Sequence, residues 1–167
     1  FPKVDGSPGD PSKAVPRLTR WTFDLSRNTD DYKSERLNDL PCEFPRLDER
    51  LTGRAYRYGY FACDNNPRVK VGGFNGIGRV DQRTGRTEIY DVGEACATNE
   101  PIFVPRSDDA PEGAGYLLAN VYEANRNATH LVILDAENVA AGPLAKAYLD
   151  HRVPFGFHGN WCPEATL

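Results

Sequence analysis

The chain has 167 residues, a formal net charge of −4 at pH 7 and a pI near 5.4. An acidic chain whose charges are mixed in sign offers no continuous basic face, which argues against nucleic acid or an anionic membrane surface as the main partner. No run of the sequence approaches the roughly 18 apolar residues of a membrane-spanning helix, and the length is sufficient for one domain with a sizeable core.

The chain starts at Phe1 and contains no methionine, so we expect it to be part of a longer translation product. Its four cysteines, Cys42, Cys63, Cys96 and Cys162, form no C-x-x-C pair and show no metal-ligand spacing. Reduced thiols in a cytoplasmic protein are the simplest interpretation of this pattern.

The N-terminal region predicts an irregular segment followed by a strand. Residues 1–16 contain four prolines and two glycines, which favour irregular structure. Alternating residues over 17–25 predict a strand, and the polar run 26–35 predicts a loop. We therefore expect one folded unit over 17–167, preceded by the irregular segment.

A row of tyrosines indicates the next strand. Residues 54–61 place Tyr56, Tyr58 and Tyr60 on one face at a period of two, which is a strong strand signal. Such a row could line a substrate path. It is more typical of packing between neighbouring sheets, and that is the interpretation we favour.

The clearest hairpin of the sequence follows a loop predicted over 64–75. Strands over 78–81 and 87–90 flank the turn residues 82–86, where Gly85 can supply the positive φ of a tight turn. The glycines that precede this hairpin resemble a phosphate-binding loop only superficially, because no helix is predicted after them.

The same pattern of short strands continues to the C-terminus. Strands are predicted over 102–105, 116–123, 129–135 and 145–149, a loop over 108–115, and a helical turn over 136–141 that Gly142 and Pro143 stop. Since helix is otherwise scarce, the sequence predicts an all-β fold, either a propeller or a sandwich.

Two landmarks recur at a nearly constant stride. Glu43 and Glu100 are 57 residues apart, and His158 follows Glu100 after 58. A second landmark, an apolar strand that ends in aspartate, returns at Asp24, Asp81 and Asp135. A repeat of about 50 residues is typical of a propeller or solenoid. About three such units fit the chain, which is fewer than the 4–8 blades that close a propeller.

If the repeats are blades, two carboxylates and one imidazole would project toward a common axis. Imidazole suits a metal ion, and carboxylates orient metal-bound histidines by accepting their second N–H. The stride therefore predicts a metal centre, with Glu43, Glu100 and His158 at or around it.

Three motifs carry a resemblance to a known family. Residues 43–60 (EFPRLDERLTGRAYRYGY), 99–106 (NEPIFVPR) and 153–159 (VPFGFHG) resemble the C-terminal part of the carotenoid cleavage oxygenases, a family that includes lignostilbene dioxygenases and the retinal pigment epithelial membrane protein. The resemblance extends from about Arg17 to Trp161, but covers only about the last third of a family member.

The resemblance implies a fold, a cofactor and a reaction. The family fold is a seven-bladed β-propeller with a non-haem Fe(II) held by four histidines, of which His158 matches the last. Glu43 and Glu100 match two of three glutamates that hydrogen-bond ligand histidines. The other ligands would lie upstream, so this chain alone would be inactive. The implied reaction uses O2 to cleave one alkene bond of an apolar conjugated substrate, an apocarotenoid or a stilbene, into two carbonyl products.

Aromatic residues near the predicted axis are candidates for a substrate tunnel. These are Phe103, Phe155, Phe157 and Trp161. The remaining histidines, His130 and His151, match no ligand position in the family, and we expect structural or exposed roles for them.

Two further expectations concern partners and an alternative function. Three blades leave sheet edges and blade faces uncovered, so we expect either the missing N-terminal part or self-association to cover them. The alternative is a non-catalytic propeller or sandwich module that binds a protein partner, in which case the phase of Glu43, Glu100 and His158 would be incidental.

Overall fold

The computed structural model describes residues 4–7, 15–66 and 73–163. Within these ranges the strands are β1 (Thr19–Phe23), β2 (Tyr32–Arg36), β3 (Cys42–Arg46), β4 (Tyr58–Cys63), β5 (Gly76–Asp81), β6 (Thr87–Asp91), β7 (Cys96–Thr98), β8 (Ile102–Pro105), β9 (Gly115–Glu123), β10 (Ala128–Asp135) and β11 (Pro143–Tyr148). Two short 3-10 helices, η2 (Glu49–Leu51) and η3 (Val139–Ala141), complete the described secondary structure. None of the described helices has the length and apolar character needed to cross a membrane.

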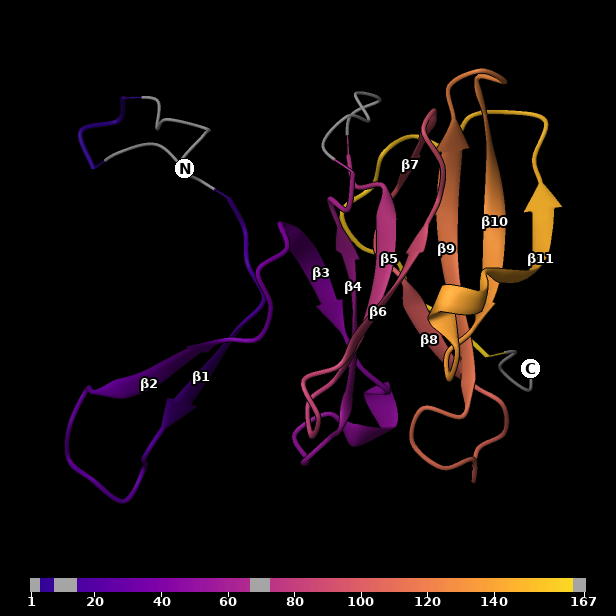
Figure 1. The fold of residues 1–167 in the computed structure, drawn as a ribbon. Helices are drawn as coiled ribbons and strands as arrows, with labels where there is room; N and C mark the ends of the chain where they lie inside the picture. The colour runs from indigo at the N-terminus through magenta and orange to yellow at the C-terminus, as the bar shows by residue number, and fades with distance from the viewer. Residues whose placement is uncertain (1–3, 8–14, 67–72, 164–167) are drawn as a thin grey trace.

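The strands form three antiparallel sheets (Figure 1). The first is the β1–β2 hairpin, which stands apart from the rest. The second has the order β3-β4-β5-β6, and the third has the order β11-β10-β9, with β7 and β8 both paired to β9. The three sheets correspond to the three repeats expected from the sequence, the first with only two strands in the described part.

The main core lies between the second and third sheets. Along β9 alternate residues are buried in this core, as a period of two requires, whereas β4 is buried on both faces, with Tyr60 in this core and Phe61 in a smaller cluster on the other side. Tyr60 of β4 stacks on Phe103 of β8 with ring centroids 5.4 Å apart and planes 7° apart. The other fully buried members are Ile77, Leu117, Val121, Val132, Leu134, Ala136 and Val139. The packing of Tyr60 confirms the expected role of this tyrosine between sheets.

The predicted hairpin and the later strands are confirmed. β5 and β6 pair in register around Gly85, whose φ of 73° is the left-handed conformation expected of the turn. Gly78 is required by packing instead, because a Cβ there would lie 2.3 Å from the Phe61 ring. β8 to β11 and the turn η3, which ends at Gly142, lie where the sequence placed them.

The N-terminal predictions need correction. The predicted loop 26–35 is wrong in its second half, because β2 begins at Tyr32 and pairs with β1. β2 is fully exposed, so its polar sequence shows no alternation to reveal a strand. The strand predicted from residue 54 begins only at Tyr58, and Tyr56 is exposed before it. In the predicted irregular segment, residues 1–3 and 8–14 lie outside the described ranges.

Candidate metal-ligand site

Glu43 and Glu100 lie at matching interruptions in the first strands of the second and third sheets. β3 pairs with β4 at Glu43, loses register, and pairs again at Arg46. The break coincides with Phe44, whose φ is 56°, and Pro45, which has no N–H to donate. In the third sheet, β7 and β8 pair with different parts of β9, and Glu100 lies in the gap between them. The step from Glu43 to Glu100 therefore joins equivalent places in successive sheets, whereas His158 lies in the segment after β11.

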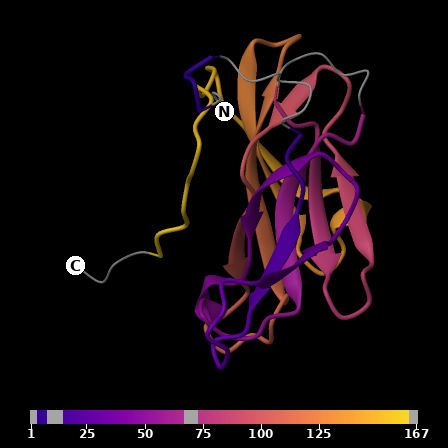
Figure 2. The ribbon, with the colours of Figure 1, turned by 90° about the vertical axis from the view of Figure 1, so that its left-hand side faces the viewer.

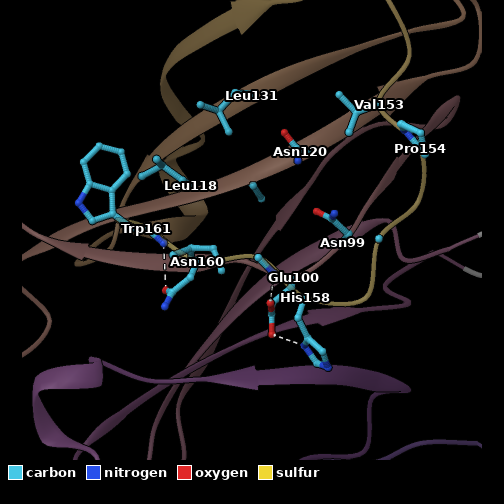
Figure 3. A pocket seen from close by; sticks show the side chains of 14 residues that line it. Asn99, Glu100, Leu118, Asn120, Leu131, Val153, Pro154, His158, Asn160 and Trp161 are labelled. Carbon is cyan, nitrogen blue, oxygen red and sulfur yellow. Dashed lines mark hydrogen bonds and ion pairs between the residues drawn. The ribbon is translucent and has the colours of Figure 1, made fainter. Parts of the chain in front are cut away.

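The structure brings Glu100 and His158 together. His158 Nδ1 lies 3.1 Å from Glu100 Oε1, and the backbone N–H of Gly159 donates to Oε2 at 3.0 Å (Figure 3). The Glu100 side chain is 4% exposed, whereas that of His158 is 74% exposed. Because a carboxylate accepts at Nδ1, this nitrogen carries the proton of the neutral ring, and Nε2 keeps the free lone pair.

Arg46, at the end of β3 in the second sheet, contacts both Glu100 and the residues that follow His158. Its Nη1 lies 3.1 Å from Glu100 Oε2 and donates to the carbonyl of Gly159 at 3.2 Å, while Nη2 donates to Asn160 Oδ1 at 3.2 Å. Burial alone would raise the pKa of Glu100. The N–H of Gly159, the His158 ring and the Arg46 guanidinium outweigh burial and lower this pKa below its ordinary value. Glu100 is therefore an ionised acceptor at neutral pH.

The exposed side of His158 faces a hollow that it shares with Glu43. This hollow of about 540 Å³ is lined by both residues together with Trp21, Phe44 and Phe157. Phe44 meets the His158 ring edge to face, with centroids 6.0 Å apart. Glu43 is exposed, and within the described part of the chain its carboxylate has no hydrogen bond or ion pair. Its role beside a ligand histidine stays a prediction.

The donor set fits a single ligand position of a metal centre. Across the described residues no group of three or more His, Cys, Asp or Glu side chains could hold a metal ion. What the site offers is one exposed imidazole, oriented at Nδ1 by a buried carboxylate, which is the usual support of a metal-bound histidine. Neutral imidazole nitrogen suits Fe(II), and the remaining ligands must come from outside these residues.

The tunnel candidates fall into two groups. Phe155, Phe157 and Trp161 belong to the segment after β11 and are about half exposed or more, and Figure 2 shows this segment running along one side of the sheets. Together with the third sheet, the segment lines a hollow of about 310 Å³, with Trp161 at one end (Figure 3). Phe103 instead is 7% exposed and stacked in the main core, which makes it a packing residue in this structure.

The other two histidines occupy the kinds of place expected of them. His130 is buried on β10, with Nδ1 3.0 Å from Glu123 Oε1, and burial lowers its pKa. The side chain of His151 is 66% exposed, and its Nδ1 lies 2.7 Å from Asp150 Oδ1. Neither contacts Glu100.

Sequence reasoning missed Arg46, Gly159 and Asn160. Arg46 closes the motif EFPR that begins at Glu43, and the other two residues directly follow His158. Arg46 and Gly159 lie inside the motifs 43–60 and 153–159, and this position marked them as possible site residues. The contact itself joins residues 113 positions apart, which no local pattern could reveal.

Comparison with known proteins gives a consistent assignment. A family model described as retinal pigment epithelial membrane protein matches residues 2–163. Isoeugenol monooxygenase of Pseudomonas nitroreducens is 40% identical over 98% of this chain and 36% of its own length. Lignostilbene-α,β-dioxygenase isozyme III of Sphingomonas paucimobilis is also 40% identical, over 100% of this chain and 36% of its own.

A solved structure supports the fold. The lignostilbene dioxygenase of Pseudomonas brassicacearum superimposes with a TM-score of 0.88 at 35% identity, covering 98% of this chain and 36% of that one. The match confirms the predicted fold class, part of a β-propeller. The chain thus spans about a third of the length of the relatives that it matches.

Proposed function

Because the chain belongs to the retinal pigment epithelial membrane protein family, the carotenoid oxygenases, we propose that it is the C-terminal part of an Fe(II)-dependent oxygenase. The whole enzyme would cleave a carbon–carbon double bond with O2 and give two carbonyl products. The observation that carries the proposal is the pair formed by the buried Glu100 and the exposed His158, joined at Nδ1 over 3.1 Å.

In this proposal His158 supplies one iron ligand through Nε2. Glu100 holds the ring in one orientation and keeps the proton on Nδ1, and the N–H of Gly159 fixes the second carboxylate oxygen. Glu43 would do the same for a histidine outside this chain. Fe(II), when bound, supplies the site at which O2 reacts with the alkene.

The substrate we favour is an aryl alkene of the stilbene or propenylphenol type rather than an apocarotenoid. Two relatives at 40% identity are named for isoeugenol and lignostilbene, both aromatic alkenes. Phe155, Phe157 and Trp161 would offer exposed aromatic faces for stacking on such rings.

The partner we propose for this chain is the remaining part of the propeller. Asp24 directly follows β1, and the same landmark is the last residue of β5 at Asp81 and of β10 at Asp135. By this equivalence β1 and β2 are the last two strands of a sheet whose first strands lie upstream. Trp21, Phe23 and Tyr32 are half exposed or more on this hairpin, and would self-associate where the rest is absent.

A chimera tests the proposal. This chain would replace the matching third of the Sphingomonas lignostilbene dioxygenase, and iron content and cleavage of a hydroxystilbene would be measured. We expect about one iron per chimera and cleavage activity, with both lost in His158→Ala and both retained in His151→Ala. Full iron occupancy in His158→Ala would refute the ligand assignment.

A further inference from the structure

We propose that Arg46 is a positioning residue for His158, acting from the second sheet on a ligand carried by the segment after β11. The inference rests on the proposed function, since it concerns the orientation of the same imidazole. Its basis is a single guanidinium that contacts Glu100, which binds the ring, and Gly159 and Asn160, which directly follow the ring in the chain.

The guanidinium restrains the histidine from two sides. Nη1 reaches Glu100 Oε2 at 3.1 Å and the Gly159 carbonyl at 3.2 Å, so it ties the carboxylate to the backbone that carries the imidazole. Nη2 reaches Asn160 Oδ1 at 3.2 Å and also pairs with Glu49. Without Arg46, the segment around His158 would keep its hydrogen bonds to Glu100 and that of Asn160 to Glu49, but would lose the group that joins Glu100 to Gly159 and Asn160.

The interrupted strand explains why Arg46 reaches this place. The positive φ of Phe44 and the following Pro45 break the pairing of β3 with β4, which resumes only at Arg46. The Arg46 side chain is 16% exposed and that of Glu100 4%, so this ion pair is largely desolvated, whereas the hydrogen bonds from Arg46 to Gly159 and Asn160 are exposed. The planar fork of arginine can serve several acceptors at once, which the ammonium group of lysine does less well.

The chain provides an internal contrast. Arg106 ends the NEPIFVPR motif as Arg46 ends EFPR. Arg106 is 51% exposed, lies 3.8 Å from Glu137, and stacks over Tyr116 rather than reaching a carboxylate at a strand interruption. The contact with a buried carboxylate is therefore specific to Arg46 and is not shared by the arginine that ends the second motif. Arg106→Gln is the matched control for Arg46→Gln.

The first test uses this chain and the 15N chemical shifts of its three histidines. We expect His158 to show a protonated Nδ1 in the unchanged chain and a mixture of both tautomers in Arg46→Gln. Arg46→Lys should restore the signature in part, and Arg106→Gln should leave it unchanged. The buried His130 reports whether each variant keeps its fold. Identical His158 shifts in Arg46→Gln, with His130 unchanged, would overturn the proposal.

The second test uses the chimera and separates this proposal from the proposed function. Loss of a group that orients a ligand typically weakens metal affinity about 10–100-fold, and we expect that loss of iron affinity in Arg46→Gln but not in Arg106→Gln. If His158→Ala loses iron while Arg46→Gln keeps full affinity, only the role of Arg46 fails. If His158→Ala keeps iron, the proposed function fails whatever Arg46 does. Should Arg46→Gln not fold, Arg46→Lys carries the same test, with full affinity and unchanged shifts counting against the proposal.

Discussion

Glu43 and Glu100 occupy equivalent interruptions in two successive sheets, yet their surroundings differ. Glu100 is buried and bound by His158, Gly159 and Arg46. Glu43 is exposed and lines a hollow, and within the described residues no hydrogen bond or ion pair reaches its carboxylate. The Glu100 carboxylate thus has its partners within this chain, whereas the Glu43 carboxylate has none among the described residues.

Under the proposed function, this difference would mean that the repeating fold divides a metal centre between distant segments. Each sheet contributes one carboxylate at the same place, but a carboxylate gains its partner only when the matching histidine is present. A chain that spans about a third of its relatives completes one such pair, and the second pair would need residues from elsewhere.

The largest effect on the stability of the chain should come from weakening the packing between the two sheets that carry these carboxylates. Phe103→Ala removes the ring that stacks on Tyr60 in the main core, and such substitutions typically cost about 3–5 kcal/mol of unfolding free energy. Phe157→Ala is the control, because its ring is 81% exposed and its loss should change stability by about 0.5 kcal/mol or less. Urea unfolding measures both. Equal, small effects would mean that the sheets do not fold as one unit.

Glu100→Ala should have the next largest effect on this chain. It removes one of the two carboxylates that pair with the largely buried Arg46, together with the acceptor of the His158 ring and of the Gly159 N–H, and the loss of a buried hydrogen-bond partner costs about 1–3 kcal/mol. The same urea experiment applies. A stability loss below about 0.5 kcal/mol would contradict the view that Glu100 is completed within the chain.

Lowering the pH should reduce the stability of the chain by a smaller amount, because the effect depends on the protonation of one histidine, His130 of the third sheet. Burial lowers the pKa of His130 below its ordinary 6.5, against the attraction of Glu123 and with the repulsion of Lys146 and Arg126. The folded state therefore disfavours the protonated ring. Stability is fully present above pH 6.5 and falls as the pH drops toward the lower folded value.

Unfolding free energies measured between pH 7.5 and about pH 5 check this dependence. We expect His130→Phe to remove the slope and His151→Ala, which alters an exposed ring, to keep it. A slope that persists unchanged in His130→Phe would assign the acid sensitivity to other groups.

Local patterns in the sequence predict local structure, whereas contacts between distant segments leave no such pattern. The hairpin around Gly85 was predictable because alternation and turn chemistry are local. β2 was missed because an exposed strand has no apolar face, and β3 because Pro45 and the positive φ of Phe44 interrupt it. The stride and the family motifs indicated Glu100 and His158 as site residues. The bracing by Arg46 was not predictable, since it depends on how two sheets pack.

The smallest effect on this chain should come from Glu43, and it is the sharpest test of the comparison. Glu43→Gln changes an exposed side chain without partners among the described residues, so we expect the stability of the isolated chain to change by about 0.5 kcal/mol or less. In the chimera the same substitution should weaken iron affinity about 10–100-fold, because there the carboxylate would orient a histidine of the upstream part. The stability of the isolated chain and the iron affinity of the chimera together decide the role of Glu43. A residue that is silent in one chain and costly in the assembled protein must have its partner outside this chain, whereas a residue silent in both would be an ordinary surface charge.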